Sequence, residues 1–300
     1  MTVLITGATG LIGTQLINHL STKHNIHYLT TSKAKLNAFD KAKGFIWDIE
    51  NKNIDSRAFE KVDTIVHLCG APIAKRWTKS YKKMLYQSRI QTTQILFDHL
   101  STTTHQVKHL IAASAIGYYP SSLSTNYTED YSCHDNSFIG ELVYTWEKTN
   151  SLFNSINIPV SLLRIGLVIS YQGGILEKLS KPIAFNLGSV FGKGNQIQSW
   201  IHIDDLIGII SFLFENKQRG IFNCVAPNPI THKEMIHQLA DSMKKKIWLP
   251  NTPKWVLNLI LGEMHQILFS SQKVNCLKIK SLDYQFKYST FLKVLTDLPK

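Results

Sequence analysis

Val3-Leu4-Ile5-Thr6-Gly7-Ala8-Thr9-Gly10-Leu11-Ile12-Gly13 decides the fold of this 300-residue chain. The apolar run at its start predicts a short buried strand. Residues 14–22 then place Leu16, Ile17 and Leu20 at helical spacing. A strand, a turn with three glycines and a helix together indicate the first unit of a nucleotide-binding α/β sheet.

Each glycine of the turn is predicted to meet a different structural requirement. Gly7 allows a sharp turn off the strand, and Gly13 allows the helix to pack closely on the strand. Gly10 lacks a Cβ, so backbone N–H groups at the start of the helix can approach a pyrophosphate, which the helix dipole also attracts. The plainer alternative is that the glycines only let the chain pass from strand to helix.

The composition is that of an ordinary globular chain, with 44% apolar residues in one large domain or in a large and a small one. The four cysteines are scattered without Cys-x-x-Cys spacing, which indicates free thiols in a reducing compartment. No secretory signal is expected, because the first apolar run passes at once into the glycine turn. The apolar segment Trp255–Phe269 is interrupted by polar residues and predicts no membrane span. We therefore expect a cytoplasmic protein.

The net charge of +12 would suit a nucleic-acid partner. However, the lysines are spread along the chain with a run only at 244–246, and no basic and aromatic stripe accompanies them. We expect a lysine-rich surface and no nucleic-acid partner. Twelve histidines likewise predict no metal site, because the spaced pair His105 and His109 has no further ligand close by.

The segment after the second predicted strand (26–29) indicates the type of cofactor. The end of that strand faces the adenosine ribose, where an acid would bind the 2′-hydroxyl and repel a 2′-phosphate. The chain has Thr30-Thr31-Ser32-Lys33-Ala34-Lys35 there and no acid. NADP(H) is therefore preferred, with NAD(H) as the second candidate; the alternative is a solvated loop with lysines of no function. Asp48, at the end of the next predicted strand, is expected to bind the adenine amino group.

Strands and helices alternate along the rest of the chain. Further strands are predicted at 63–68, 107–113, 160–163, 196–203 and 220–225. Three helices are also predicted: a long one at 79–100, one N-capped by Asp204-Asp205, and one with a capping box from Thr231 to about Met243. This alternation predicts an α/β fold with a Rossmann-type, doubly wound parallel sheet. We expect it to span residues 1–230, with a pocket-forming insertion around 170–200. Residues 231–300 are expected to form a small, mostly helical domain on the substrate side.

Eight motifs follow one another along nearly the whole chain: Thr6–Gly13, Gly70–Trp77, Ser88–Thr92, Ser114–Tyr119, Arg164–Val168, Ser199–Asp205, Phe222–Pro229, and Gly262–Met264 with Ser271-Gln272. With these motifs the chain resembles the atypical and extended short-chain dehydrogenase/reductases known as epimerase family proteins. Their glycine spacing is also Gly-x-x-Gly-x-x-Gly. The resemblance implies an NAD(P)-binding domain followed by a small C-terminal domain particular to the family.

The resemblance also implies a catalytic serine or threonine, tyrosine and lysine, of which the tyrosine exchanges a proton with the substrate as hydride moves to or from the nicotinamide. Ser114 fits the serine position. The Tyr-x-x-x-Lys pair belongs on the next helix, but Ile139 and Val143 stand there, and neither can transfer a proton. Tyr144 and Lys148 have the right spacing but lie five positions further on, roughly 140° away around the helix. We interpret these two as packing and surface residues.

The candidate residues fall into three groups. Ser114 and Tyr119 are the candidates for catalysis. Other acid-base groups or pocket residues are Tyr118, Glu141, Glu147, Arg76, Trp77, Gln196, Trp200 and His202. Residues expected to bind the cofactor are Gly7, Thr9, Gly10, Leu11, Ile12, Gly13, Thr31, Ser32, Lys33, Asp48, Leu68, Cys69, Gly70, Ala71, Ser88, Ser114, Arg164 and Gly166.

These observations predict an NADP(H)-dependent oxidoreductase, or an enzyme similar to nucleotide-sugar epimerases, that acts on a small polar substrate. The alternative is a non-catalytic NADP(H)-binding sensor or scaffold, which the missing tyrosine and lysine favour. Relatives commonly dimerise through the helices predicted at 79–100 and 138–156, so a homodimer is the candidate assembly.

Overall fold

Eight strands form the central sheet of the computed structural model, which describes residues 1–297. They are β1 (Thr2–Thr6), β2 (Asn25–Thr30), β3 (Ala42–Asp48), β4 (Asn53–Ile54), β5 (Val62–His67), β6 (His109–Ala115), β8 (Val160–Ile165) and β13 (Gly220–Cys224). Their order is β13-β8-β6-β5-β1-β2-β3-β4, and all neighbours are parallel except β3 and β4. The strand order reverses between β1 and β5, which leaves a crevice at their carboxyl ends. The predicted doubly wound sheet is confirmed.

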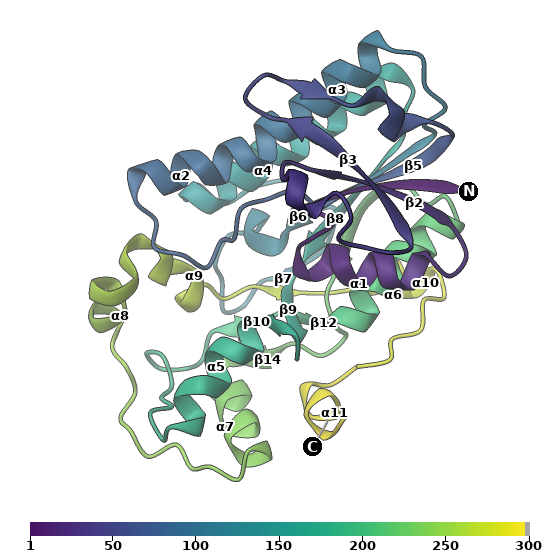
Figure 1. Cartoon of the computed structure of the whole chain (residues 1–300). Coiled ribbons are helices and arrows are strands. Elements are labelled where there is room, and N and C mark those ends of the chain that lie inside the picture. The colour runs from purple at the N-terminus through teal and green to yellow at the C-terminus, as the bar shows by residue number, and fades with distance from the viewer. Residues whose placement is uncertain (298–300) are drawn as a thin grey trace.

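Helices cover both faces of this sheet (Figure 1). One face carries α1 (Leu11–Leu20), α6 (Ile203–Glu215) and α10 (Leu277–Ser281), and the other carries α2 (Lys79–Tyr86), α3 (Thr92–Thr102) and α4 (Phe138–Ser151). Each layer of helices packs against the sheet and forms its own apolar core. Leu16 and Ile209 belong to the first core, and Leu96 and Phe153 belong to the second. Because both faces are covered, the strands are nearly continuous apolar runs.

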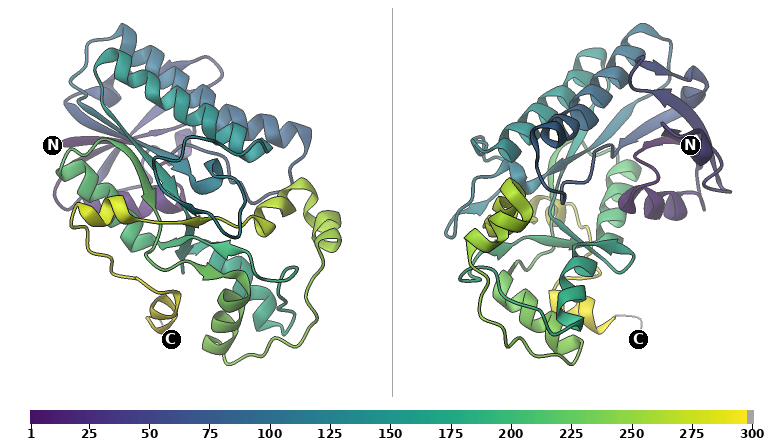
Figure 2. Two further views of the ribbon diagram at one scale, coloured as in Figure 1. Left: turned by 180° about the vertical axis from the view of Figure 1, so that it is seen from behind. Right: turned by 60° about the vertical axis from the view of Figure 1, so that its left-hand side comes forward.

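A second lobe lies beyond the carboxyl ends of the large strands (Figures 1 and 2). Its elements are β7 (Asn126–Tyr127), β9 (Leu167–Ser170), β10 (Gly173–Gly174), β11 (Ile197–Gln198), β12 (Trp200–His202), β14 (Ile230–Thr231), β15 (Lys273–Val274), α5 (Ile175–Ala184), α7 (His232–Ser242), α8 (Lys254–Leu261), α9 (His265–Phe269) and α11 (Phe291–Thr296). Trp200, Met235 and Phe291 belong to one core, so residues on both sides of 230 pack together in this lobe. The domain boundary at residue 230 stays a prediction.

Two details of the helices differ from the sequence analysis. The helix predicted at 79–100 contains a π-helical turn at Gln87–Gln91, which joins α2 to α3. The prediction that Asp204 and Asp205 form the N-cap of α6 is wrong, because the His202 ring nitrogen accepts the N–H of Asp204 at 3.2 Å. The Asp205 carboxylate instead accepts the backbone N–H groups of Lys287 and Tyr288 at 2.7 and 2.9 Å. The capping box at Thr231 is confirmed. Within residues 1–297, none of the helices has the length and apolar character needed to cross a bilayer.

His67 at the end of β5 should make the stability of the sheet depend on pH. The imidazole is fully buried between the hydroxyls of Thr6 and Thr93, at 2.8 and 3.0 Å, and burial lowers its pKa from 6.5 to about 4. Between these pH values the unfolded chain binds the extra proton, so stability is complete above pH 6.5 and is lost as the pH falls toward 4. The free energy of unfolding should therefore drop between pH 7 and pH 5 by about 2 kcal/mol more in the wild type than in His67→Gln. Urea unfolding at both pH values measures this difference, and parallel losses in the two proteins would contradict the assignment.

Candidate functional site

The three glycines of the first turn have different spatial requirements. Gly7 has a φ of +67°, and a Cβ there would lie 2.7 Å from the carbonyl oxygen of Leu68. A Cβ on Gly13 would lie 2.7 Å from Cα of Ala8, so this glycine packs the helix against the turn itself rather than against the strand. A Cβ on Gly10 would meet only the Gly7 oxygen, at 3.2 Å. Gly7 and Gly13 are therefore required by the fold, whereas Gly10 leaves an open space.

The space at Gly10 lies at the start of α1. Gly10 is the N-cap residue, and no side chain in the described part of the chain caps the helix. The N–H groups of the first turn, which includes Leu11 and Ile12, have no partner within the helix. An uncapped helix start without a Cβ in front of it is suited to a phosphate. The residues present therefore fit a dinucleotide.

The neighbouring strand ends supply the other residues expected at the cofactor. Leu68 and Cys69 lie directly against Gly7, and Ser88 accepts the backbone N–H of Ala71 at 2.9 Å. Burial raises the pKa of the Cys69 thiol to about 11, so this thiol stays protonated. The glycine turn, the turn after β5 and the π-helical turn thus form one continuous edge of the crevice.

The predicted phosphate-binding segment follows β2. Lys33–Lys35 forms a short 3₁₀ turn, and the Lys35 Nζ lies 3.4 Å from the hydroxyl of Thr9 in the glycine turn. Thr31 and Lys33 are exposed, and Ser32 is half-buried. Lys35 thus lies beside the glycine turn, and Lys33 begins the same 3₁₀ turn.

Asp48 ends β3, as predicted. Its carboxylate accepts the backbone N–H groups of Glu50 and Asn51 and the Asn51 side-chain amide, at 2.8–3.0 Å. These hydrogen bonds lower the pKa of Asp48, so it is ionised at neutral pH. The carboxylate already shapes the turn after β3, and any contact with adenine would be additional to these bonds.

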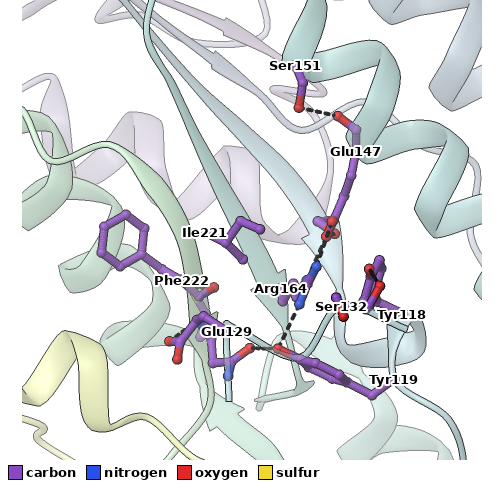
Figure 3. A network of polar contacts seen from close by, with 12 residues as sticks. Tyr118, Tyr119, Glu129, Ser132, Glu147, Ser151, Arg164, Ile221 and Phe222 are labelled. Atoms are coloured by element: carbon purple, nitrogen blue, oxygen red, sulfur yellow. Dashed lines mark hydrogen bonds and ion pairs between the residues drawn. The ribbon is translucent and has the colours of Figure 1, made fainter. Parts of the chain in front are cut away.

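Ser114 and Arg164 are held in a buried network rather than left free in the crevice. Figure 3 shows Arg164 between Glu147 and Tyr119. The Ser114 hydroxyl donates to Glu147 at 2.5 Å, and Arg164 donates two hydrogen bonds of 2.8 Å to the same carboxylate. Arg164 is 2% exposed. Burial alone would lower the pKa of Arg164, but the hydrogen bonds and charge of Glu147 outweigh it and raise the pKa above its usual range. The Glu147 carboxylate therefore holds both the Ser114 hydroxyl and the Arg164 guanidinium by hydrogen bonds.

Tyr119 belongs to the same network and is fully buried. Its hydroxyl accepts from Arg164 at 2.9 Å and lies 2.7 Å from the side-chain oxygen of Asn223, to which it donates. Burial raises the pKa of Tyr119 to about 12, whereas a tyrosine that exchanges protons near neutral pH needs a lowered pKa. Tyr118 packs its ring on Arg164, 3.6 Å from the guanidinium carbon, and burial raises its pKa as well. The two tyrosines therefore surround Arg164 and do not form an open acid-base pair.

A pocket of about 460 Å³ opens between the ends of β6 and β8 and the segment around α8 and α9. Ile139, which the resemblance places at the expected tyrosine position, is one of its lining residues. Asp135 and Lys254 are the only ionisable side chains among the lining residues in the described chain. The other polar ones are Ser121, Ser137, Gln198, Ser199, Gln266, Ser270 and Gln272. The volume suits a small molecule.

Most of the remaining candidates do not reach this pocket. Gly166 and Trp77 line it, with the Trp77 ring nitrogen bonded to the Ile73 carbonyl. The others serve packing, capping or surface contacts. Gln196, Trp200 and His202 are buried, and Arg76 lies against Gly262. On α4, Glu141 pairs with His134, Tyr144 stacks on the same histidine, and Lys148 lies over Tyr144. A larger hollow of about 1000 Å³ lies at the opposite edge of the sheet, near Thr2 and Asn25, and contains none of the candidates. Within residues 1–297, no cluster of histidine, cysteine or acidic residues is arranged to hold a metal.

The doubly wound sheet, the uncapped glycine turn and the pocket at the carboxyl edge define an NAD(P)-binding α/β protein. Residues 3–224 match the model of the NAD dependent epimerase/dehydratase family, and the chain belongs to this family. Residues 252–298 match a second model, DUF1731, a domain of unknown function.

Close relatives extend over the whole chain. Epimerase family proteins of Staphylococcus epidermidis and Staphylococcus aureus are 37% and 36% identical over 99% of this chain and 98% of their own length. The structure of human epimerase family protein SDR39U1 with NADPH is similar at a TM-score of 0.86 and 27% identity, covering 99% of this chain and 98% of that one. UDP-glucuronic acid 4-epimerase from Bacillus cereus, in complex with UDP-glucuronic acid and NAD, shares the fold at a TM-score of 0.78 and 19% identity, covering 99% and 97%.

Several pocket residues were missed by the sequence analysis. Asp135 lies in the loop before α4, and Lys254, Gln266 and Gln272 come from the C-terminal segment. The motif that contains Gln272 was noted, but sequence position alone does not show that this segment returns to the ends of β6 and β8. The Gln272 amide donates to the carbonyl oxygen of Tyr119, which fixes that return.

Proposed function

We propose that this protein is an NADP(H)-dependent oxidoreductase or epimerase-like enzyme that acts on a small polar substrate in the 460 Å³ pocket. The observation that carries the proposal is the uncapped, Cβ-free start of α1, beside which Lys35 lies against Thr9 of the glycine turn. The NADPH present in the structure of the human relative supports the same cofactor here.

The chain's own residues would bind the cofactor along the strand ends. N–H groups after Gly10 would bind the pyrophosphate, and Lys33 and Lys35 would neutralise a 2′-phosphate. Asp48 would accept the adenine amino group. When bound, the nicotinamide supplies or accepts a hydride.

Proton transfer at the substrate needs a group other than the usual tyrosine. Ser114 and Tyr119 would position their neighbours rather than transfer a proton. The reason is that the Ser114 hydroxyl is hydrogen-bonded to Glu147 and the Tyr119 hydroxyl to Arg164. Asp135 is the carboxyl group among the lining residues and is the candidate to hold or release the substrate proton. A small neutral or singly charged substrate fits a lining with one acid and one amine.

Thermal unfolding with NADPH, NADH or neither tests the proposal. A ligand at about a hundred times its dissociation constant adds about 2.7 kcal/mol to the folded state, which raises the midpoint visibly. A larger rise with NADPH is expected. No rise with either cofactor, after removal of any bound during purification, would contradict the proposal. Binding without redox turnover of any carbonyl or alcohol substrate would favour a sensor or scaffold.

Charge reversal after β2 tests the preference for the phosphate. Lys33→Glu and Lys35→Glu should each weaken NADPH binding about tenfold or more, because a charge-assisted contact becomes repulsive, while NADH binding changes less than about threefold. Lys23→Glu, an exposed lysine after α1, is the matched control. Titration of cofactor fluorescence gives both affinities, and equal losses for NADPH and NADH would show that neither lysine meets the 2′-phosphate.

A further inference from the structure

Arg89 is a half-buried cation to which the proposed site assigns no role. It lies in the π-helical turn Gln87–Gln91, within the long helix that runs beside α4 (Figures 1 and 2). Insertions of this kind are frequent at functional sites because they turn a side chain out of the regular helical register.

The Arg89 guanidinium is held against the turn that follows β5. One terminal nitrogen donates to the carbonyl oxygen of Ala71 at 3.1 Å, and the other donates to that of Leu85 at 3.2 Å. A Cβ on Gly70 would lie 3.0 Å from the guanidinium. The guanidinium carbon also lies 5.2 Å from the ring centroid of Trp146 on α4. Arg89 is thus fixed at the carboxyl edge of the sheet, between β5 and α4.

Among the described residues 1–297, no carboxylate balances this charge. Arg57 pairs with Asp55 and Arg164 pairs with Glu147, but within residues 1–297 Arg89 forms no ion pair. Its Nε has no hydrogen-bond partner in that part of the chain and is not among the nitrogens sealed from solvent. Burial lowers the pKa of Arg89 to about 10, so the group is charged at neutral pH. A cation removed from water without a counter-ion is unfavourable, and an anion from outside the chain would offset that cost.

We infer that Arg89 binds a phosphate of the dinucleotide on its nicotinamide half, an inference that rests on the proposed function. The residues expected at the adenosine half lie at the ends of β1 and β2, whereas Arg89 lies on the other side of β5, toward α4 and β6. A guanidinium matches a phosphate with two parallel hydrogen bonds.

The test compares two ligands that share only the adenosine half. Arg89→Met should weaken NADPH binding about 10- to 100-fold, the usual loss when a charge-assisted contact is removed. The affinity for adenosine 2′,5′-bisphosphate, which lacks the nicotinamide half, should change less than about twofold. Arg57→Met is the matched control, since this exposed arginine pairs with Asp55 away from the crevice, and both of its affinities should equal those of the wild type. Calorimetric titration measures all of them.

Arg89→Lys keeps the charge but not the planar fork, so its NADPH affinity should lie between those of the wild type and Arg89→Met. Equal losses for both ligands in the two Arg89 variants would show that Arg89 only supports the turn after β5 and would overturn the inference. Unchanged NADPH affinity would also overturn it. A wild type that binds neither ligand would refute the proposed function itself, and the role of Arg89 with it.

Discussion

Replacing Arg164 by methionine is expected to lower the free energy of unfolding by about 3–5 kcal/mol, the usual cost of removing one partner from a buried ion pair. The Arg164 and Glu147 side chains are 2% and 9% exposed, and two hydrogen bonds join them. Removing Arg164 leaves the Glu147 carboxylate buried with only the Ser114 hydroxyl as a side-chain donor. It also removes the donor to Tyr119.

Urea unfolding of the wild type and four variants tests this expectation. Glu147→Leu leaves Arg164 without its counter-ion, so it should also lose several kcal/mol, whereas the double variant Arg164→Met with Glu147→Leu should lose less than these two single variants together. Arg57→Met is the control for an exposed pair and should cost at most about 1 kcal/mol. A loss below about 1 kcal/mol in Arg164→Met would mean that the network contributes no more than a surface ion pair.

Gly10→Val is expected to weaken the binding of both NADPH and NADH by about 100-fold or more without unfolding the protein. The φ of Gly10 is −84°, which any residue can adopt, and a Cβ meets only the Gly7 oxygen at 3.2 Å. The added methyl groups would instead fill the space before the first N–H groups of α1, where a pyrophosphate must approach. A loss of about 100-fold corresponds to about 2.7 kcal/mol of binding free energy.

Gly13→Ala is the contrasting variant. Its Cβ would overlap the backbone of Gly7 and Ala8, so it should lower stability by about 1–3 kcal/mol, as overpacked sites do. Denaturant unfolding and cofactor titration of both variants separate the two effects. Unchanged affinity in Gly10→Val would refute the assignment of the glycine turn to a dinucleotide.

Local patterns were enough to predict seven of the eight strands of the central sheet, whereas the two-residue strand β4 was not predicted. Val3-Leu4-Ile5 and the other strands are short apolar runs bounded by turn residues, and both faces of the sheet are in fact covered. The helix α5 was not predicted, because glycines at 173 and 174 precede it and Pro182 lies inside it. Its stability comes from packing against α7 in the second lobe, which no local pattern records.

The sequence by itself determined the glycine turn between strand and helix, the family, and the presence of Ile139 and Val143 where a tyrosine and a lysine are expected, because these depend on residue type and spacing. Only the tertiary structure decided what the side chains around the missing pair do. Ser114, Glu147 and Arg164 lie on β6, α4 and β8, and their hydrogen bonds form because parallel strands and their covering helix meet at one edge. Likewise, Lys254 and Gln272 line the pocket because the C-terminal segment returns to the ends of β6 and β8, which lie far earlier in the chain. Spacing along a sequence predicts contacts within one element, whereas contacts between distant elements follow from how those elements pack.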